Sequence, residues 1–326
     1  MLITHVNNTP SLNYETISER TMANIKHSVS ANTKKAYESD LKHFKNWMSD
    51  NNLVFSLPIP AGVLADYVSD LDEQNFSIAT IERRLNAIRW MHRVNDAQEV
   101  HTGNRLLSMT MQGLKRKRAE EGRKTTSESK QPLMVDELKA VISLIDTGTL
   151  SGIRDKAMLL VGFASALRRS ELVALTVEDI TITGQGADIK IRKSKTDQTG
   201  QGDSVSIMRG SPDLCPILAL VDWYEASGIK SGSVFLRFTP NRCIYPAAIT
   251  GRTYANTIKK YCKMSGLNAD RYSGHSTRSG MLTSAAEKGC NLIQLAQHAR
   301  HKNTNQTMYY VRQADRFKNN PTEGLL

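Results

Sequence analysis

The sequence has few of the features that mark secreted, membrane or metal-binding proteins. None of its four cysteines (Cys215, Cys243, Cys262 and Cys290) forms a C-x-x-C pair, and their spacing fits neither a zinc site nor a disulfide framework. We expect reduced, mostly buried thiols. The longest apolar stretch, residues 157–167, is too short to span a bilayer. The first residues lack the basic region and apolar core of a signal peptide. These absences predict a cytoplasmic protein without a membrane segment.

The composition indicates a globular, basic protein. The chain has 326 residues, of which 40% are hydrophobic and 23% are charged, a normal balance for folded domains. This length suits two domains that each bury a core of their own. The net charge is +11, and a basic surface attracts polyanions through counterion release. Nucleic acid is the leading candidate partner, and a basic surface without such a partner is the alternative.

The first part of the chain has a helical pattern throughout. From Leu12 to Glu121, apolar residues recur at steps of three and four, and no alternating strand pattern is visible. One such stripe includes Tyr37 and Trp47, on a helix expected to start near Ser30. The sequence therefore predicts an all-helical domain over residues 1–121.

A mixed domain is expected over residues 133–326. It follows the segment 122–132, which is polar, lacks aliphatic residues and ends in a proline, as linkers do. Isoleucines then alternate with polar residues over 180–191, and glycines supply turns, which predicts a short antiparallel sheet. The rest has helical periodicity. The fold class expected for the whole chain is mainly α with a small antiparallel β-sheet (α+β).

Two short motifs in this domain place cations where they could meet a ligand. Arg168 ends an apolar helix, and Glu171 is close enough in sequence to hold its guanidinium. Lys195 lies in a polar turn just past a predicted strand, where its ammonium group could donate a proton. Taken singly, the first motif is better explained as a buried structural ion pair, and the second as a solvated hairpin lysine.

Two further motifs combine histidine with arginine or tyrosine. His275 and Arg278 are three residues apart at an expected helix start, where unpaired main-chain N–H groups favour an anion such as phosphate. His301 precedes Tyr310 by nine residues. A tyrosine, with a pKa near 10, is a nucleophile only when its proton is removed and the developing charge is stabilised. Singly, these motifs also fit surface and packing residues.

Together, the four motifs resemble the tyrosine recombinases, also called the phage-integrase family. The matching segments are A-L-R-R-S-E-L, the Lys195 turn, G-H-S-T-R-S-G and H-K-N-T-N-Q-T-M-Y-Y, with S-A-N-T-K-K-A-Y-E-S-D-L similar to the start of the family's core-binding domain. The likeness runs from about Ser30 to Arg312, and the length and plan are similar to those of the Cre and Xer recombinases. It implies a helical core-binding, DNA-binding domain, followed by a mixed catalytic domain.

The resemblance also implies a role for each matched residue. Arg168 and Arg278 would grip the scissile phosphate, and Tyr310 would attack it to form a 3′-phosphotyrosine. By the same analogy Lys195 would protonate the departing 5′-oxygen, and His275 would assist proton transfer at the tyrosine. His301 would bond a phosphate oxygen, and Glu171 would orient the site. Neither a metal nor another cofactor is expected.

Two positions depart from the family's usual pattern. Arg300 stands where the family commonly has glycine, so the main chain at this turn must tolerate a side chain. Tyr309 adjoins Tyr310, and neighbours on a helix point about 100° apart, because the helix has roughly 3.6 residues per turn. Only one tyrosine can face the phosphate, and the spacing from His301 favours Tyr310.

The resemblance further implies that the partner is double-stranded DNA with an inverted-repeat site, clamped by two domains within a homotetramer. The C-terminal tail, which ends in Leu325 and Leu326, is either a segment that docks on a neighbouring subunit or a frayed end. Integration, excision, plasmid dimer resolution and transposition all remain open as roles.

Basic residues of the first domain are candidates for DNA contact: Lys34, Lys35, Arg83, Arg84, Arg89, Lys115, Arg116, Lys117 and Arg118.

Three other functions remain as alternatives. A type-IB topoisomerase shares the chemistry but relaxes supercoils without a partner site, and the recombinase-like helical domain argues against it. A DNA-binding module with an inactive site is the second. A metal hydrolase using His298 and His301 is the third, but neither a carboxylate-rich cluster nor an H-E-x-x-H helix supports it.

Overall fold

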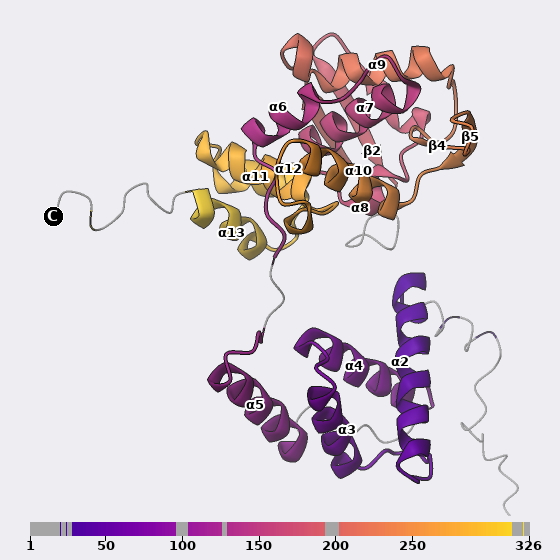
Figure 1. The fold of residues 1–326 in the computed structure, drawn as a ribbon, viewed down its shortest axis with the longest axis vertical. Coiled ribbons are helices and arrows are strands. Elements are labelled where there is room, and N and C mark those ends of the chain that lie inside the picture. Colours follow the sequence, from indigo (N-terminus) through magenta and orange to yellow (C-terminus); the bar gives the residue numbers. More distant parts are fainter. Residues whose placement is uncertain are drawn as a thin grey trace, which may run out of the picture. The chain divides into compact units, whose positions relative to one another are not determined.

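The protein is described by a computed structural model that covers residues 20, 24, 28–95, 104–125, 129–192, 202–314 and 322. The chain divides into two compact units, Met1–Glu128 and Ser129–Leu326, which are described separately (Figure 1). Helices predominate in both, and the strands of the second unit pair in small antiparallel sheets. The expected fold class, mainly α with a small antiparallel β-sheet, is confirmed.

Polar side chains cap the starts of the helices α2, α4 and α5 in the first unit. The helix α2 begins where the sequence predicted, because the Ser30 side chain accepts a hydrogen bond from the Thr33 amide. Ser77 and Asn104 cap α4 and α5 in the same way. The helices are α2 (Ala31–Asp50), α3 (Ala61–Glu73), α4 (Ile78–Val94) and α5 (Arg105–Glu120).

The core of the first unit is built around an aromatic cluster. The rings of Phe44, Trp47 and Tyr67 lie against one another with centroids 4.9 to 6.1 Å apart. The Trp47 indole N–H donates to Asp70 at 2.6 Å, so its polar atom is satisfied at the rim of the core. Burying these rings supplies much of the apolar stabilisation of α2 against α3.

The second unit is arranged around the buried helix α7. This helix packs against α9 and α11, which in turn contacts α13 (Figure 1). Between the helices lie short 3-10 turns at Val177–Asp179, Pro212–Leu214 and Ala269–Arg271. The helices are α6 (Val135–Ser143), α7 (Leu150–Ala164), α8 (Arg169–Leu172), α9 (Pro216–Ser227), α10 (Gly251–Met264), α11 (Ser276–Glu287), α12 (Leu292–Ala299) and α13 (Thr304–Ala314).

The predicted short antiparallel sheet is present, and it has three strands in the order β1 (Ile180–Ile182), β2 (Gly186–Ile191), β3 (Asp203–Met208). All its pairs are antiparallel, and Ile189 of β2 is fully buried. A second hairpin, β4 (Leu236–Phe238) with β5 (Ile244–Ala248), was not predicted. Its strands are too short to show alternation. In the turn between them, the Thr239 amide donates to the Cys243 carbonyl.

A close main-chain approach anchors the start of the second unit to α11. The Leu133 amide donates to the Ser276 carbonyl at 2.8 Å. A Cβ on Gly280 would lie 1.8 Å from the Leu133 carbonyl oxygen. Glycine at this position is what allows the segment before α6 to lie directly on α11.

The cysteines only partly follow the expectation of mostly buried thiols. Cys215 and Cys262 are buried, whereas Cys243 and Cys290 are exposed, so the expectation is wrong for half of them. Within the described residues, no helix is both long and apolar enough to cross a bilayer.

Candidate active site

The turn between α7 and α8 sets the position of Arg168. Ala166 has a left-handed backbone (φ 47°), which turns the chain sharply at the end of α7. Arg168 then caps α8, and its main-chain N–H donates to Glu171 Oε2 at 2.9 Å. Its Nη1 donates to Glu171 Oε1 at 2.7 Å. One carboxylate therefore fixes both the main chain and the guanidinium of Arg168.

Glu171 is buried, and its environment keeps it ionised. Burial by itself favours the protonated acid. The hydrogen bonds from Arg168, together with the charges of Arg300 and Arg168, outweigh burial and lower the pKa of this carboxyl group. A charged Glu171 can then hold two guanidinium groups at once.

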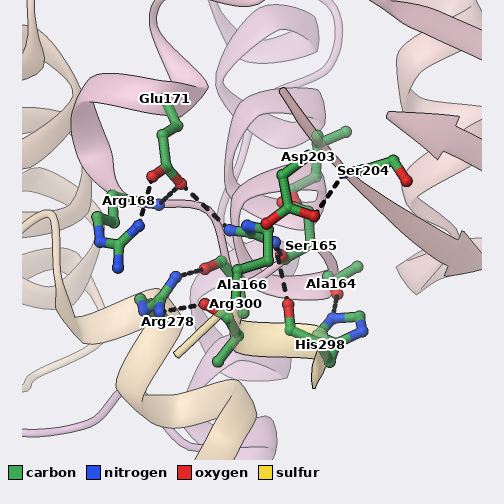
Figure 2. Close-up of polar contacts among 12 residues, drawn as sticks. Ala164, Ser165, Ala166, Arg168, Glu171, Asp203, Ser204, Arg278, His298 and Arg300 are labelled. Atoms are coloured by element: carbon green, nitrogen blue, oxygen red, sulfur yellow. Dashed lines mark hydrogen bonds and ion pairs between the residues drawn. The ribbon is translucent and has the colours of Figure 1, made fainter. Parts of the chain in front are cut away.

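Arg278 is held by main-chain oxygens instead of a carboxylate. It lies on α11 and is 1% exposed. Its Nη1 donates to the Ala166 carbonyl and its Nη2 to the Ala299 carbonyl (Figure 2). Burial, followed by the nearby charges of Arg168 and Arg300, lowers the pKa of Arg278 to about 10. It is therefore still a cation at neutral pH, and its anchors do not neutralise it.

His275 and Tyr310 meet although they are 35 residues apart in sequence. His275 is the N-cap of α11, and its Nε2 lies 3.3 Å from the Tyr310 hydroxyl oxygen. The Tyr310 ring packs with Leu282, Leu295 and Ala299 in a small apolar cluster. Burial raises the pKa of Tyr310, although the charge of Arg278 opposes this. Desolvation, with Arg278 and Arg168, lowers the pKa of His275, so its ring is neutral at pH 7 and able to accept a proton.

His301 stands beside the same tyrosine. Its ring is parallel to that of Tyr310, with centroids 6.3 Å apart and an interplanar angle of 14°. Its Nδ1 lies 2.8 Å from the Thr307 hydroxyl, which orients the ring. Burial and the charges of Arg278, Arg168, Arg300 and His275 lower the pKa of His301 to about 4.

Arg300, which stands where the family commonly has glycine, is the C-cap of α12. Its backbone is left-handed (φ 55°). Its side chain does not reach solvent. It bonds Glu171 Oε2 at 3.1 Å and the His298 carbonyl at 3.0 Å (Figure 2). The turn thus tolerates the bulky residue by folding its side chain inward. Sequence analysis missed this role, although a long cation in place of glycine was the signal.

His298 and His301 do not point to a shared metal. The Nε2 of His298 lies 2.8 Å from the Ala164 carbonyl, and the Nδ1 of His301 is engaged by Thr307. Across the described parts of the chain, no cluster of three or more His, Cys, Asp or Glu residues could hold a metal ion.

Most of the predicted site residues converge in the second unit. Arg168, Glu171, His275, Arg278, His301 and Tyr310 come from α8, α11, α13 and the turns beside them. Lys195, in the connection between β2 and β3, lies outside the described residues, as do Leu325 and Leu326 of the tail. The two tyrosines differ: Tyr309 is 51% exposed, whereas Tyr310 is 9% exposed and contacts His275.

The basic residues of the first unit divide into exposed and buried ones, which corrects part of the expectation. Arg84 is buried over the Phe76 ring, 4.0 Å from its centroid. Arg118 is buried too, with its Nε donating to Asp72. Both stabilise the first unit and cannot reach DNA in this conformation. Lys34, Lys35, Arg83, Arg89, Lys115, Arg116 and Lys117 keep full or partial exposure.

Comparison with known proteins gives the same family for both units. Residues 131–316 match the phage integrase family, and residues 22–99 match the phage integrase N-terminal SAM-like domain. The integrase/recombinase xerD homolog of Selenomonas ruminantium is 30% identical over 311 residues, 94% of this chain and 89% of that protein. Recombinase cre of Escherichia phage P1 is 24% identical, covering 96% of this chain and 95% of that protein.

The fold is also similar to solved recombinase structures. The XerH recombinase in a post-cleavage complex with its difH substrate has a TM-score of 0.64 and 16% identity, covering 92% of this chain and 83% of that one. The Tn1549 transposon integrase in complex with transposon right end DNA has a TM-score of 0.62 and 17% identity, covering 89% and 93%. The family expected from the four motifs is confirmed: the chain belongs to the phage integrase family of tyrosine recombinases, enzymes that cleave and rejoin DNA strands.

Proposed function

We propose that the chain is a site-specific recombinase that cleaves DNA through a 3′-phosphotyrosine at Tyr310. The observation that carries this proposal is the contact of the Tyr310 hydroxyl with His275, beside two arginines that keep donors for a phosphate. Among the described residues, the Nε and Nη2 of Arg168 donate to no acceptor. Arg278 uses one N–H of each terminal nitrogen and keeps the other.

The chemistry is an in-line displacement at phosphorus. The Tyr310 oxygen forms a bond to the scissile phosphorus, the bond to the 5′-oxygen breaks, and the tyrosine proton passes to His275. The raised pKa of Tyr310 makes such a base necessary, and the lowered pKa of His275 keeps the base neutral. Arg168 and Arg278 would stabilise the charge that develops on the non-bridging oxygens.

The remaining site residues would support this step. His301, oriented by Thr307, would donate from Nε2 to a phosphate oxygen. Glu171 would fix Arg168. Lys195 would protonate the departing 5′-oxygen. The phosphotyrosine keeps the energy of the broken phosphodiester, so the 5′-hydroxyl of a partner strand can displace the tyrosine without ATP.

A partner strand requires an assembly on DNA, and we propose a homotetramer that holds two inverted-repeat sites and exchanges strands through a Holliday junction. A solved XerH complex holds a palindromic difH substrate, and a lambda integrase complex holds a dimer on a core site, which supports the inverted-repeat site and more than one subunit on it. The exposed basic residues of the first unit would add DNA contacts. The cytoplasmic location expected from the sequence stays a prediction.

Covalent trapping tests the proposal. The protein is incubated in EDTA with sheared DNA that includes the flanks of its own gene, denatured, and any attached DNA is sequenced. Wild type and Tyr309→Phe should form a protein–DNA adduct, and Tyr310→Phe should not. An adduct that persists in Tyr310→Phe would refute the assignment of the nucleophile.

The same trapped sequence separates the alternatives. Two copies on one plasmid should recombine, whereas relaxation of a supercoiled plasmid without exchange would indicate topoisomerase-like activity. Binding of DNA with no adduct from wild type would indicate an inactive binding module.

A further inference from the structure

Arg300 is a buried cation that the cleavage mechanism above does not use. Its side chain is 4% exposed and lies between the α7–α8 turn and the end of α12 (Figure 2). Burial lowers the pKa of its guanidinium, whereas Glu171 and Asp203 oppose that effect. Burying a cation costs free energy unless ion pairs and hydrogen bonds offset the loss of its hydration.

The bonds of Arg300 join the two segments that carry the reacting groups. Its Nη2 donates to Glu171 Oε2 at 3.1 Å, and its Nη1 reaches the Ser165 carbonyl at 3.5 Å and the His298 carbonyl at 3.0 Å. Ser165 and Glu171 flank Arg168. Arg300 itself directly precedes His301, in the turn that leads to α13 and Tyr310.

The Glu171 carboxylate therefore bonds two arginines at once. Oε1 accepts from the Arg168 guanidinium, while Oε2 accepts from the Arg168 amide and from Arg300. Without Arg300, Oε2 would lose the guanidinium that it binds among the described residues. The carboxylate could then rotate to take two nitrogens of Arg168 in a bidentate pair, the geometry that this ion pair favours. The donors of Arg168 that face a phosphate would be lost to Glu171.

We propose that Arg300 is a positioning residue for strand cleavage, which holds Glu171 and thereby keeps Arg168 aligned with the segment that carries His301 and Tyr310. This inference rests on the proposed function of the site. Arg300 touches no reacting atom. Its role is to restrict the rotation of one carboxylate and to fix the distance between two turns.

The test uses single-turnover cleavage of a nicked duplex built from the trapped sequence. The nick releases a short strand, so cleavage cannot reverse. Arg300→Gly removes the side chain, and glycine adopts the left-handed backbone of this turn without strain. Arg300→Lys keeps the charge with fewer donors. Lys288→Met, at an exposed position at the end of α11, is the control for a lost positive charge.

We expect Arg300→Gly to lower the cleavage rate at saturating DNA by about 10- to 100-fold, with DNA affinity within about twofold of wild type, because positioning acts on the chemical step. Arg300→Lys should recover part of the rate, and Lys288→Met should match wild type. In a Glu171→Gln background, Arg300→Gly should cost only a few-fold, because the two residues act as one unit.

Equal losses in both backgrounds would overturn the proposal, since a merely structural Arg300 would act independently of Glu171. A wild-type rate in Arg300→Gly would overturn it too. If Arg300→Gly fails to fold, Arg300→Lys decides by the same cycle. Absence of an adduct from wild-type protein would instead refute the proposed function, and the inference would fall with it.

Discussion

The Nε2 of His275 lies 3.3 Å from the hydroxyl oxygen of Tyr310, and the two residues come from different helices. The contact joins the start of α11 to the last described helix. A proton leaving the tyrosine therefore has an acceptor already in place before any phosphate arrives.

We expect the cleavage rate to depend on the protonation of His275. Its pKa is lowered, so the ring is neutral at pH 7, and the rate should fall only when the pH drops through that lowered pKa, below the usual value of about 6.5. His275→Gln should reduce single-turnover cleavage by roughly 10²- to 10⁴-fold and remove this acid limb. A limb that persists in the variant would belong to His301 or Glu171.

Arg278→Lys should impair chemistry more than binding. An ammonium group cannot donate to two carbonyls and also span a phosphate, as the guanidinium does. Cleavage at saturating DNA should fall by roughly 10²- to 10³-fold, the usual cost of losing one such donor. The control is Arg271→Lys, at an exposed residue of the same unit. Near-normal cleavage by Arg278→Lys would remove this residue from the phosphate site.

Substitution of Arg118 should destabilise the first unit, whereas substitution of its neighbour Lys117 should not. Arg118→Met leaves Asp72 buried with its main partner removed, which should destabilise the first unit by about 3–5 kcal/mol in urea unfolding. Lys117→Met should leave stability within about 0.5 kcal/mol. If the exposed lysine contacts a phosphate, its loss should reduce the salt dependence of DNA binding by about one unit of slope. Equal stability of the two variants would contradict the assigned burial.

Gly280→Ala should destabilise the second unit by about 3 kcal/mol or more, because its Cβ would meet the Leu133 carbonyl oxygen at 1.8 Å. Gly113, within α5, has nothing within 4 Å of such a Cβ. Gly113→Ala should stabilise its helix by about 0.5–1 kcal/mol. Denaturant unfolding of both variants checks the contrast, and a neutral Gly280→Ala would show that the Leu133 segment can move away.

His301 should make the stability of the second unit depend on pH. Its folded pKa is lowered to about 4, so between that pH and about 6.5 the unfolded chain binds a proton that the folded chain does not. Stability should therefore fall as the pH drops from 6.5 towards 4. The effect is on the order of 1 kcal/mol, once solvent screening of this partly exposed ring is allowed for. His301→Gln should flatten the dependence of Tm on pH, and an unchanged slope would assign it to other groups, such as His275 and His298.

Local patterns predicted the fold well, and long-range packing explains what they missed. The apolar stripe predicted the helix α2, which Ser30 caps, and alternating isoleucines with glycine turns predicted a short antiparallel sheet. The β4–β5 hairpin is too short for a period to show. Arg118 looked like its exposed basic neighbours because its partner, Asp72, lies on another helix, 46 residues away.

The candidate site was predicted as a set of residues but not as an arrangement. Residue types and order named the arginines, histidines and Tyr310, and the structure brings them together except for Lys195, which lies outside the described residues. Arg300 was noted only as an obstacle to a turn. Its buried side chain is held by the main-chain carbonyls of Ser165 and His298. Every residue has such a carbonyl, so the sequence gives no sign of these contacts.

The main-chain anchoring of Arg278 has a consequence for variation. Its two acceptors are the carbonyls of Ala166 and Ala299, and every amino acid carries a carbonyl. A substitution at either alanine that keeps the backbone path leaves both bonds in place, whereas Arg168 depends on one particular side chain, Glu171. Arg278 therefore depends on the backbone path of its two supports and not on their side chains, whereas Arg168 depends on the side chain of Glu171.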